Sequence, residues 1–326
     1  GIFYISSPPI YKSINNDNAL ISAKASLSEN QSLIVFDSKN PFNFYDIFYR
    51  IDKINNQKVF GILTKPDTVG YFPIVFGIAG SGGWSEHHYA YLERYLNMGF
   101  AVFSLHSFKS RNVKSTVGQQ ISVTIPMVIY DAFMALNQIT KDKNINVNRA
   151  GILGWSLGGG VALFTAWNPI QKVISPNAKF AAHLPLYPPC MIIPDLMEFN
   201  DVPIHILAGE LDDWVPAKAC EEFVNLASKS GNRMDITIYP EAPHSFDRFT
   251  DIKFNPNAYS FTNCRMELKN SGIVTTTNGF PLMSPIMQKI GLYFCAERGI
   301  HSGGNNNARI KSMEFAKIFM KNNLMY

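Results

Sequence analysis

Short apolar runs alternate with longer amphipathic segments along most of the chain. The apolar runs at 72–79, 100–105, 150–153, 180–187, 203–208 and 235–239 are short enough to predict strands, most of them buried. Helical patterns occupy residues 85–98, about 119–141, 157–167, 217–228 and about 308–322. This alternation indicates an α/β fold, with a mostly parallel central sheet and helices on both faces.

Two regions depart from this alternation. Residues 1–45 are polar and irregular, which predicts a loosely packed N-terminal arm. Residues 46–54 and 58–64 then predict two strands, so the α/β domain spans 46–326. An excursion at about 245–304 interrupts the domain, and residues 262–277 within it have the pattern of a β-hairpin.

Composition and charge exclude several classes of function. The 326 residues are 46% hydrophobic, and the net charge of +4 comes from scattered Lys and Arg, so no nucleic-acid partner is expected. No apolar run reaches the length of a membrane span. Residues 1–18 lack the pattern of a signal peptide. The expected location is cytoplasmic or, if a signal has been removed, periplasmic or secreted.

The four cysteines leave two alternatives open. Cys190, Cys220, Cys264 and Cys295 form no C-x-x-C pair, which argues against a zinc or thioredoxin-type site. Their even number fits two disulfides in an oxidising compartment, with the pairing undetermined, or four thiols in a reducing one. No metal and no cofactor are expected.

The sequence Gly154-Trp155-Ser156-Leu157-Gly158 matches the G-x-S-x-G nucleophile elbow. An apolar strand precedes it and a helix of small residues follows, which is the context that this motif requires. Such a tight turn leaves no room for side chains two positions on either side of the serine, and it exposes the serine hydroxyl. The motif therefore predicts an α/β-hydrolase fold with Ser156 as its nucleophile.

A serine hydroxyl needs a base and an orienting acid. The chain order in this fold is Ser, then Asp or Glu, then His, and His244 lies just after the last expected strand. His301 is the competing base, but no strand precedes it. Asp212 is the expected acid, ahead of Asp213 and Glu210 in the same loop.

The oxyanion hole is expected to use two backbone N–H groups. One is that of Leu157, which follows the nucleophile. The other belongs to the loop 80–83, with Ser81 as the expected donor and Gly80 as the next candidate. These glycines do not form a dinucleotide loop, because Ser85 stands where G-x-G-x-x-G requires a third glycine.

Taken in order, these motifs resemble the dienelactone hydrolase family, in its serine-nucleophile branch. The resemblance covers roughly residues 58–250 and the last helix. It is carried by 73–83, 98–102, 107–111, 154–159, 209–216 and 244–246. It implies an enzyme that cleaves small esters or lactones without a metal. It also implies that Arg111 and Arg248 bind a substrate carboxylate, although Asp247 stands ready to pair with either arginine.

The chain departs from the family pattern in the nucleophile, which is a cysteine in the namesake enzymes. The glutamate that those enzymes carry near the oxyanion loop is also absent, so dienelactone itself is not the expected substrate. Trp84 and Trp155 adjoin the expected catalytic loops, where they would line a substrate pocket or pack in the core. Two alternatives stay open: a serine exopeptidase or amidase of related fold, and a catalytically silent binding protein.

Overall fold

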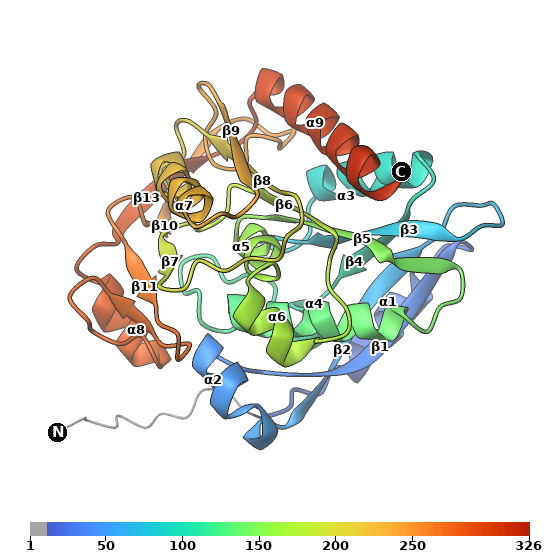
Figure 1. The fold of residues 1–326 in the computed structure, drawn as a ribbon, viewed down its shortest axis with the longest axis horizontal. Coiled ribbons are helices and arrows are strands. Elements are labelled where there is room, and N and C mark those ends of the chain that lie inside the picture. Colours follow the sequence, from blue (N-terminus) through green and yellow to red (C-terminus); the bar gives the residue numbers. More distant parts are fainter. Residues whose placement is uncertain (1–11) are drawn as a thin grey trace.

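A central sheet of eight strands organises residues 12–326, the part of the chain that the computed structural model describes (Figure 1). The strand order is β1-β2-β4-β3-β5-β6-β8-β9, and only β2 runs antiparallel to its neighbours. The strands are β1 (Gln31–Lys39), β2 (Asn56–Thr64), β3 (Phe72–Ile78), β4 (Ala101–Leu105), β5 (Ile145–Trp155), β6 (Ala182–Leu186), β8 (Ile204–Gly209) and β9 (Met234–Tyr239).

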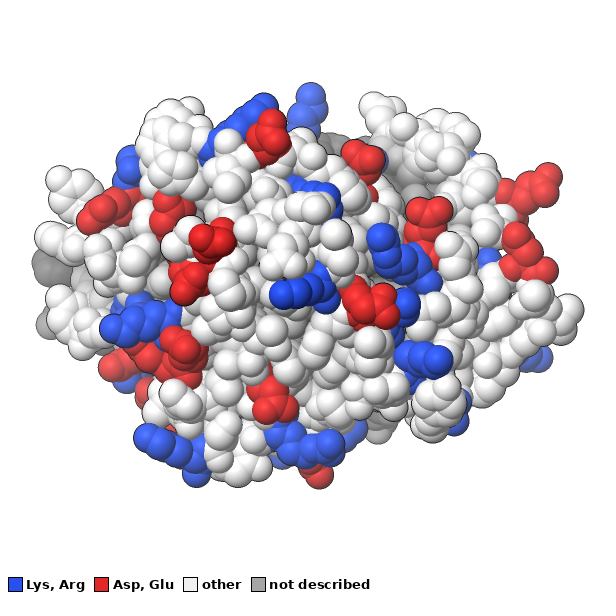
Figure 2. Space-filling model, turned by 90° about the horizontal axis from the view of Figure 1, so that it is seen from above, with Lys and Arg blue, Asp and Glu red and all other residues white. Residues whose placement is uncertain are grey.

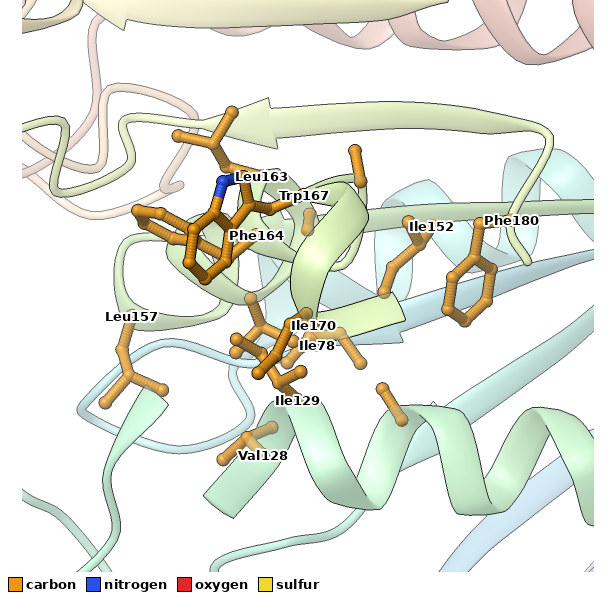
Figure 3. Packing of buried hydrophobic residues seen from close by; sticks show 14 of the residues in the cluster. Ile78, Val128, Ile129, Ile152, Leu157, Leu163, Phe164, Trp167, Ile170 and Phe180 are labelled. Carbon is orange, nitrogen blue, oxygen red and sulfur yellow. The ribbon is translucent and has the colours of Figure 1, made fainter. Parts of the chain in front are cut away.

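Helices cover both faces of this sheet. Alternate residues of β3 enter two different apolar layers: Ile74 and Phe76 face one layer and Val75 faces the other. The first layer holds α4 (Ile125–Ile139), α5 (Leu157–Phe164), α6 (Asn168–Ile174) and α7 (Ala217–Lys229). Figure 3 shows side chains of α4, α5 and the central strands packing within it. The second layer holds α3 (Glu86–Asn97) and α9 (Asn306–Leu324). The expected α/β-hydrolase fold is confirmed.

The expectation of a loosely packed arm is wrong for residues 31–45. Strand β1 pairs with β2 over its whole length and closes one edge of the sheet. Phe36, Phe42 and Phe44 are buried in the core, so this segment belongs to the folded domain. The helix α1 (Asp17–Ala25), by contrast, has no buried residue. Residues 1–11 lie outside the described part of the chain.

The strand expected at 46–54 is also wrong. This segment forms the short helix α2 (Phe44–Tyr49) and a 3₁₀ turn at Ile51–Lys53. The side chain of Asn43 accepts a hydrogen bond of 2.8 Å from the backbone N–H of Asp46, and this N-cap starts the helix. The aromatic residues favour a strand, but the cap and the burial of Phe44 and Ile47 decide for a helix.

The excursion after His244 builds small sheets beside the main one. The expected hairpin is confirmed as β11 (Met266–Leu268) paired with β12 (Val274–Thr276), and β11 also pairs with β7 (Ile192–Pro194). The remaining elements are β10 (Lys253–Ser260), α8 (Pro285–Leu292) and β13 (Glu297–Ser302). In Figure 1 these orange elements lie together on one side of the sheet.

Both cysteine pairs are oxidised, as the disulfide alternative predicts. Cys190 is bonded to Cys220, and Cys264 to Cys295. The second bond ties the start of β11 to the chain just after α8. None of the helices between residues 12 and 326 has the length and apolar character needed to cross a bilayer. On the face shown in Figure 2, acidic and basic residues are interspersed.

Candidate active site

Ser156 occupies a sharp turn between β5 and α5. Its backbone has φ 55° and ψ −113°, a conformation that residues with a side chain rarely adopt. The neighbouring glycines make this turn feasible: a Cβ on Gly154 would lie 2.0 Å from the carbonyl oxygen of Gly158. A Cβ on Gly158 would lie equally close to the carbonyl oxygen of Ile78. The tight packing thus requires glycine at both positions of the motif.

His244 lies between Ser156 and Asp212. Its Nε2 is 3.0 Å from the Oγ of Ser156, and its Nδ1 is 2.7 Å from Oδ2 of Asp212. The other carboxylate oxygen accepts hydrogen bonds of 2.9 Å from the N–H groups of Trp214 and Val215. Both His244 and Asp212 are buried, so the carboxylate and the ring are held in a fixed orientation.

The competing acids and base lie elsewhere. Asp213 pairs with the ring of His301 at 2.8 Å, and both side chains are partly exposed. The carboxylate of Glu210 accepts a hydrogen bond from the backbone N–H of Glu241. Among the three neighbouring carboxylates, Asp212 is the one that reaches His244.

The loop after β3 approaches Ser156 closely. A Cβ on Gly80 would lie 3.4 Å from the Cβ of Ser156, and Ser81 lines the same cavity as Ser156 and Leu157. The carbonyl of Ser81 accepts from the N–H of Thr116 at 2.8 Å, whereas its own N–H has no partner among the described residues. Leu157 is the first residue of α5, so its N–H has no carbonyl one helical turn before it. Two backbone donors are therefore available beside the serine.

Arg111 is not available to a substrate, contrary to the expectation. Its guanidinium is buried and forms a bidentate pair with Asp131 at 2.7 and 2.9 Å. The remaining N–H groups donate to the side chain of Asn40 and to the carbonyls of Lys39 and Ser107. All five donors are thus used within the protein.

Arg248 differs from Arg111. Its Nε is buried, and no hydrogen-bond partner of that atom occurs in residues 12–326. Its Nη2 lies 4.0 Å from where a Cβ on Gly82 would be, so the guanidinium stands beside the loop 80–83 that follows β3. It does not line the cavity that contains Ser156.

The two tryptophans do not line that cavity either. Trp155 is buried, and its indole N–H donates to Asp247 at 3.1 Å, so its expected substrate contact is wrong. Trp84 donates to the carbonyl of Leu105 at 2.9 Å and lines a separate hollow on the far side of Leu157.

The motifs did not point to a buried polar cluster around Asp247. Its carboxylate accepts hydrogen bonds from the hydroxyls of Tyr91, at 3.0 Å, and Tyr187, at 2.7 Å, as well as from Trp155. Burial and the nearby carboxylate raise the pKa of Tyr187 well above its usual value. Burial lowers the pKa of the adjacent His87 to about 4, although Asp247 opposes this. No local motif marks such a cluster, because its members lie far apart in the sequence.

A cavity of about 150 Å³ opens at Ser156. None of its lining residues is charged. Polar side chains are few there, and apolar ones dominate. The lining comes from the loop after β3, the starts of α2, α4 and α5, β7, the loop after β8 and the excursion: Phe42, Asn43, Phe44, Ser81, Gln120, Thr124, Ile125, Pro126, Ser156, Leu157, Pro189, Met191, Ile192, Trp214, Val215, Phe261, Met266, Val274, Leu282, Gln288 and Leu292.

Comparisons with known proteins agree with this geometry. The model of the dienelactone hydrolase family matches residues 61–266. A Bradyrhizobium protein named "Probable 2-oxo-3-(5-oxofuran-2-ylidene)propanoate lactonase" is 25% identical over 136 residues, which are 40% of this chain and 53% of that protein. The match thus spans about half of the relative's length. The crystal structure of a dienelactone hydrolase-like promiscuous phosphotriesterase from metagenomic libraries has a TM-score of 0.56. It is 13% identical and covers 90% of this chain and 99% of its own, which shows a shared fold.

Proposed function

The chain belongs to the dienelactone hydrolase family, and from this premise we propose that it is a serine hydrolase that cleaves a carboxylic ester or lactone. The observation that carries the proposal is the position of His244, within 3.0 Å of Ser156 on one side and 2.7 Å of Asp212 on the other. A base in this position can accept the proton of the serine hydroxyl and return it to a leaving group.

In the first half of the reaction, Oγ of Ser156 attacks the ester carbonyl while His244 Nε2 takes its proton. The negative charge that develops on the carbonyl oxygen is stabilised by the N–H groups of Leu157 and Ser81. The carbon–oxygen bond to the leaving group then breaks, and the imidazolium donates the proton to the leaving alkoxide. Asp212 stabilises the imidazolium and fixes its tautomer.

In the second half, a water molecule attacks the acyl-enzyme, and His244 again accepts the proton. The new tetrahedral oxyanion uses the same two backbone donors. When it collapses, the carboxylic acid is released and the proton returns to Ser156. The two halves together consume one ester and one water molecule and release one alcohol and one carboxylic acid.

The proposal places any negative charge of the substrate outside the cavity at Ser156. That cavity has no charged residue, and the donors of Arg111 are all used. Arg248 is the remaining candidate for a substrate carboxylate, because its buried Nε has no partner in the described chain and it lies beside Gly82. An anionic group would therefore lie beside the oxyanion loop rather than in the cavity.

The test is hydrolysis of short p-nitrophenyl esters by three variants. Ser156→Ala should lower kcat by about four orders of magnitude or more. Asp212→Asn should lower it by about 10⁴-fold, since the ring of His244 would lose its orienting acceptor. Asp213→Asn is the matched control, because Asp213 pairs with His301, and it should stay within about threefold of the wild type. Unchanged turnover by Ser156→Ala would refute the proposal.

A further inference from the structure

The cavity at Ser156 opens beside the serine and beside the two residues that carry the expected oxyanion donors. Ser156, Leu157 and Ser81 line it, whereas His244 does not. The leaving group of an ester must stand next to His244 Nε2 to receive its proton. The acyl group is thus the part of the substrate that enters this cavity.

Resting on the proposed function, we propose that the substrate is an ester of a short, uncharged, apolar carboxylic acid of about six carbons. A carboxylate in an acyl chain would lose its hydration here without gaining a cation, because no lining residue is charged. A cavity of about 150 Å³ is also large enough to hold a benzene ring.

A wall limits the length of the acyl chain. Gln120, Phe261, Gln288 and Leu292 line this cavity and also a second, larger one of about 510 Å³, so they stand between the two. The second cavity has charged groups in its lining, Lys289 and Arg298. A straight acyl chain longer than the first cavity would contact these four side chains. Removal of one of them should let the acyl chain extend into the second cavity.

The excursion supplies several of the residues that line the cavity, and covalent and strand contacts fix their position. Met266, Val274, Leu282 and Leu292 all line the cavity, and all lie between Cys264 and Cys295, which are joined by a disulfide. The crosslink closes this part of the chain into a loop, and the pairing of β11 with β7 attaches the loop to the main domain. The excursion therefore sets acyl specificity in this protein.

The experiment compares kcat/KM for p-nitrophenyl esters of acetate, butyrate, hexanoate and decanoate, and for the half ester of glutarate. For the wild type we expect a rise of about fourfold per added methylene up to hexanoate, from burial of apolar surface. The kcat/KM for the decanoate ester should be at least tenfold lower than that for the hexanoate ester. The charged glutarate half ester should fall at least tenfold below butyrate.

Two variants test the wall and the volume separately. Leu292→Ala should raise the ratio of kcat/KM for decanoate to kcat/KM for hexanoate at least tenfold. Leu226→Ala removes the same atoms from an exposed site on α7 and should leave this ratio unchanged. Val274→Phe should raise the ratio of kcat/KM for acetate to kcat/KM for hexanoate at least tenfold. If kcat/KM does not depend on chain length, or is highest for the glutarate half ester, the inference about the acyl group is wrong while the proposed function stands. Absence of any ester turnover and of any serine labelling would overturn the proposed function, and the inference with it.

Discussion

The indole of Trp155 donates a hydrogen bond to the carboxylate of Asp247 at 3.1 Å. Trp155 directly precedes Ser156, and Asp247 is three residues after His244, so this bond joins the segments that carry Ser156 and His244. Tyr187 donates to the same carboxylate, and its ring packs against His244 with the centroids 4.8 Å apart. The buried carboxylate thus anchors both the segment that carries Ser156 and the segment that carries His244.

Replacement of this anchor should be costly. Asp247→Ala leaves Tyr187 and Trp155 without their acceptor in the interior, whereas Tyr91 keeps the hydroxyl of Ser312, and each buried donor without a partner costs about 1–3 kcal/mol. We expect the free energy of unfolding in urea to fall by about 3 kcal/mol or more. Asp251→Ala, an exposed site in the same loop, is the control and should change it by less than about 0.5 kcal/mol. Equal stability of the two variants would contradict the anchoring role.

Buried histidines should make the fold sensitive to mild acid. Burial lowers the pKa of His87 and His183 to about 4 and that of His106 to about 3. In the unfolded chain these rings have a pKa of about 6.5. As the pH falls below that value, the unfolded state takes up protons that the folded state does not, so stability decreases toward pH 4.

Each such ring should contribute a slope of about 1.4 kcal/mol per pH unit in this window. Urea unfolding at pH 7, 6 and 5 measures the total slope, to which carboxylates also contribute near pH 4. His106→Gln removes one of these rings. Between pH 6 and 5 it should reduce the slope of the unfolding free energy against pH by about 1.4 kcal/mol per pH unit. If the variant and the wild type lose stability in parallel, the burial argument for this histidine fails.

Arg111 should matter for stability and not for substrate binding. Arg111→Met leaves the carboxylate of Asp131 buried without its cation, which costs about 3–5 kcal/mol. The folded fraction should keep the wild-type KM for neutral and anionic esters alike. A variant with normal stability and a raised KM for anionic esters would restore the substrate-binding role that the family resemblance implies.

The disulfide Cys264–Cys295 should stabilise the part of the excursion that lines the cavity. The two cysteines are 31 residues apart, and chain entropy alone predicts a contribution of about 3–4 kcal/mol. We expect the double variant Cys264→Ala/Cys295→Ala to unfold at a correspondingly lower urea concentration. Addition of a reductant should destabilise the wild type but not change the unfolding of a variant that also lacks Cys190 and Cys220. Insensitivity of the wild type to complete reduction would contradict this expectation.

The sequence predicted features that depend on local geometry. The elbow around Ser156 is one, because its glycines are required by contacts within a few residues or with the next strand. The roles expected for Arg111 and Trp155 are wrong for the opposite reason: their partners, Asp131 and Asp247, are 20 and 92 residues away. The aromatic residues of α2 favour a strand in the sequence pattern, whereas the cap and the burial that make it a helix depend on the tertiary fold.

The most direct test of the proposed triad is to label the protein with a fluorophosphonate and locate the adduct by peptide mass spectrometry. We expect one adduct, on the peptide that contains Ser156, lost in Ser156→Ala and formed much more slowly in Asp212→Asn than in Asp213→Asn. An unlabelled wild type under these conditions, or an adduct on a different residue, would contradict the assignment of Ser156, His244 and Asp212 as a catalytic triad.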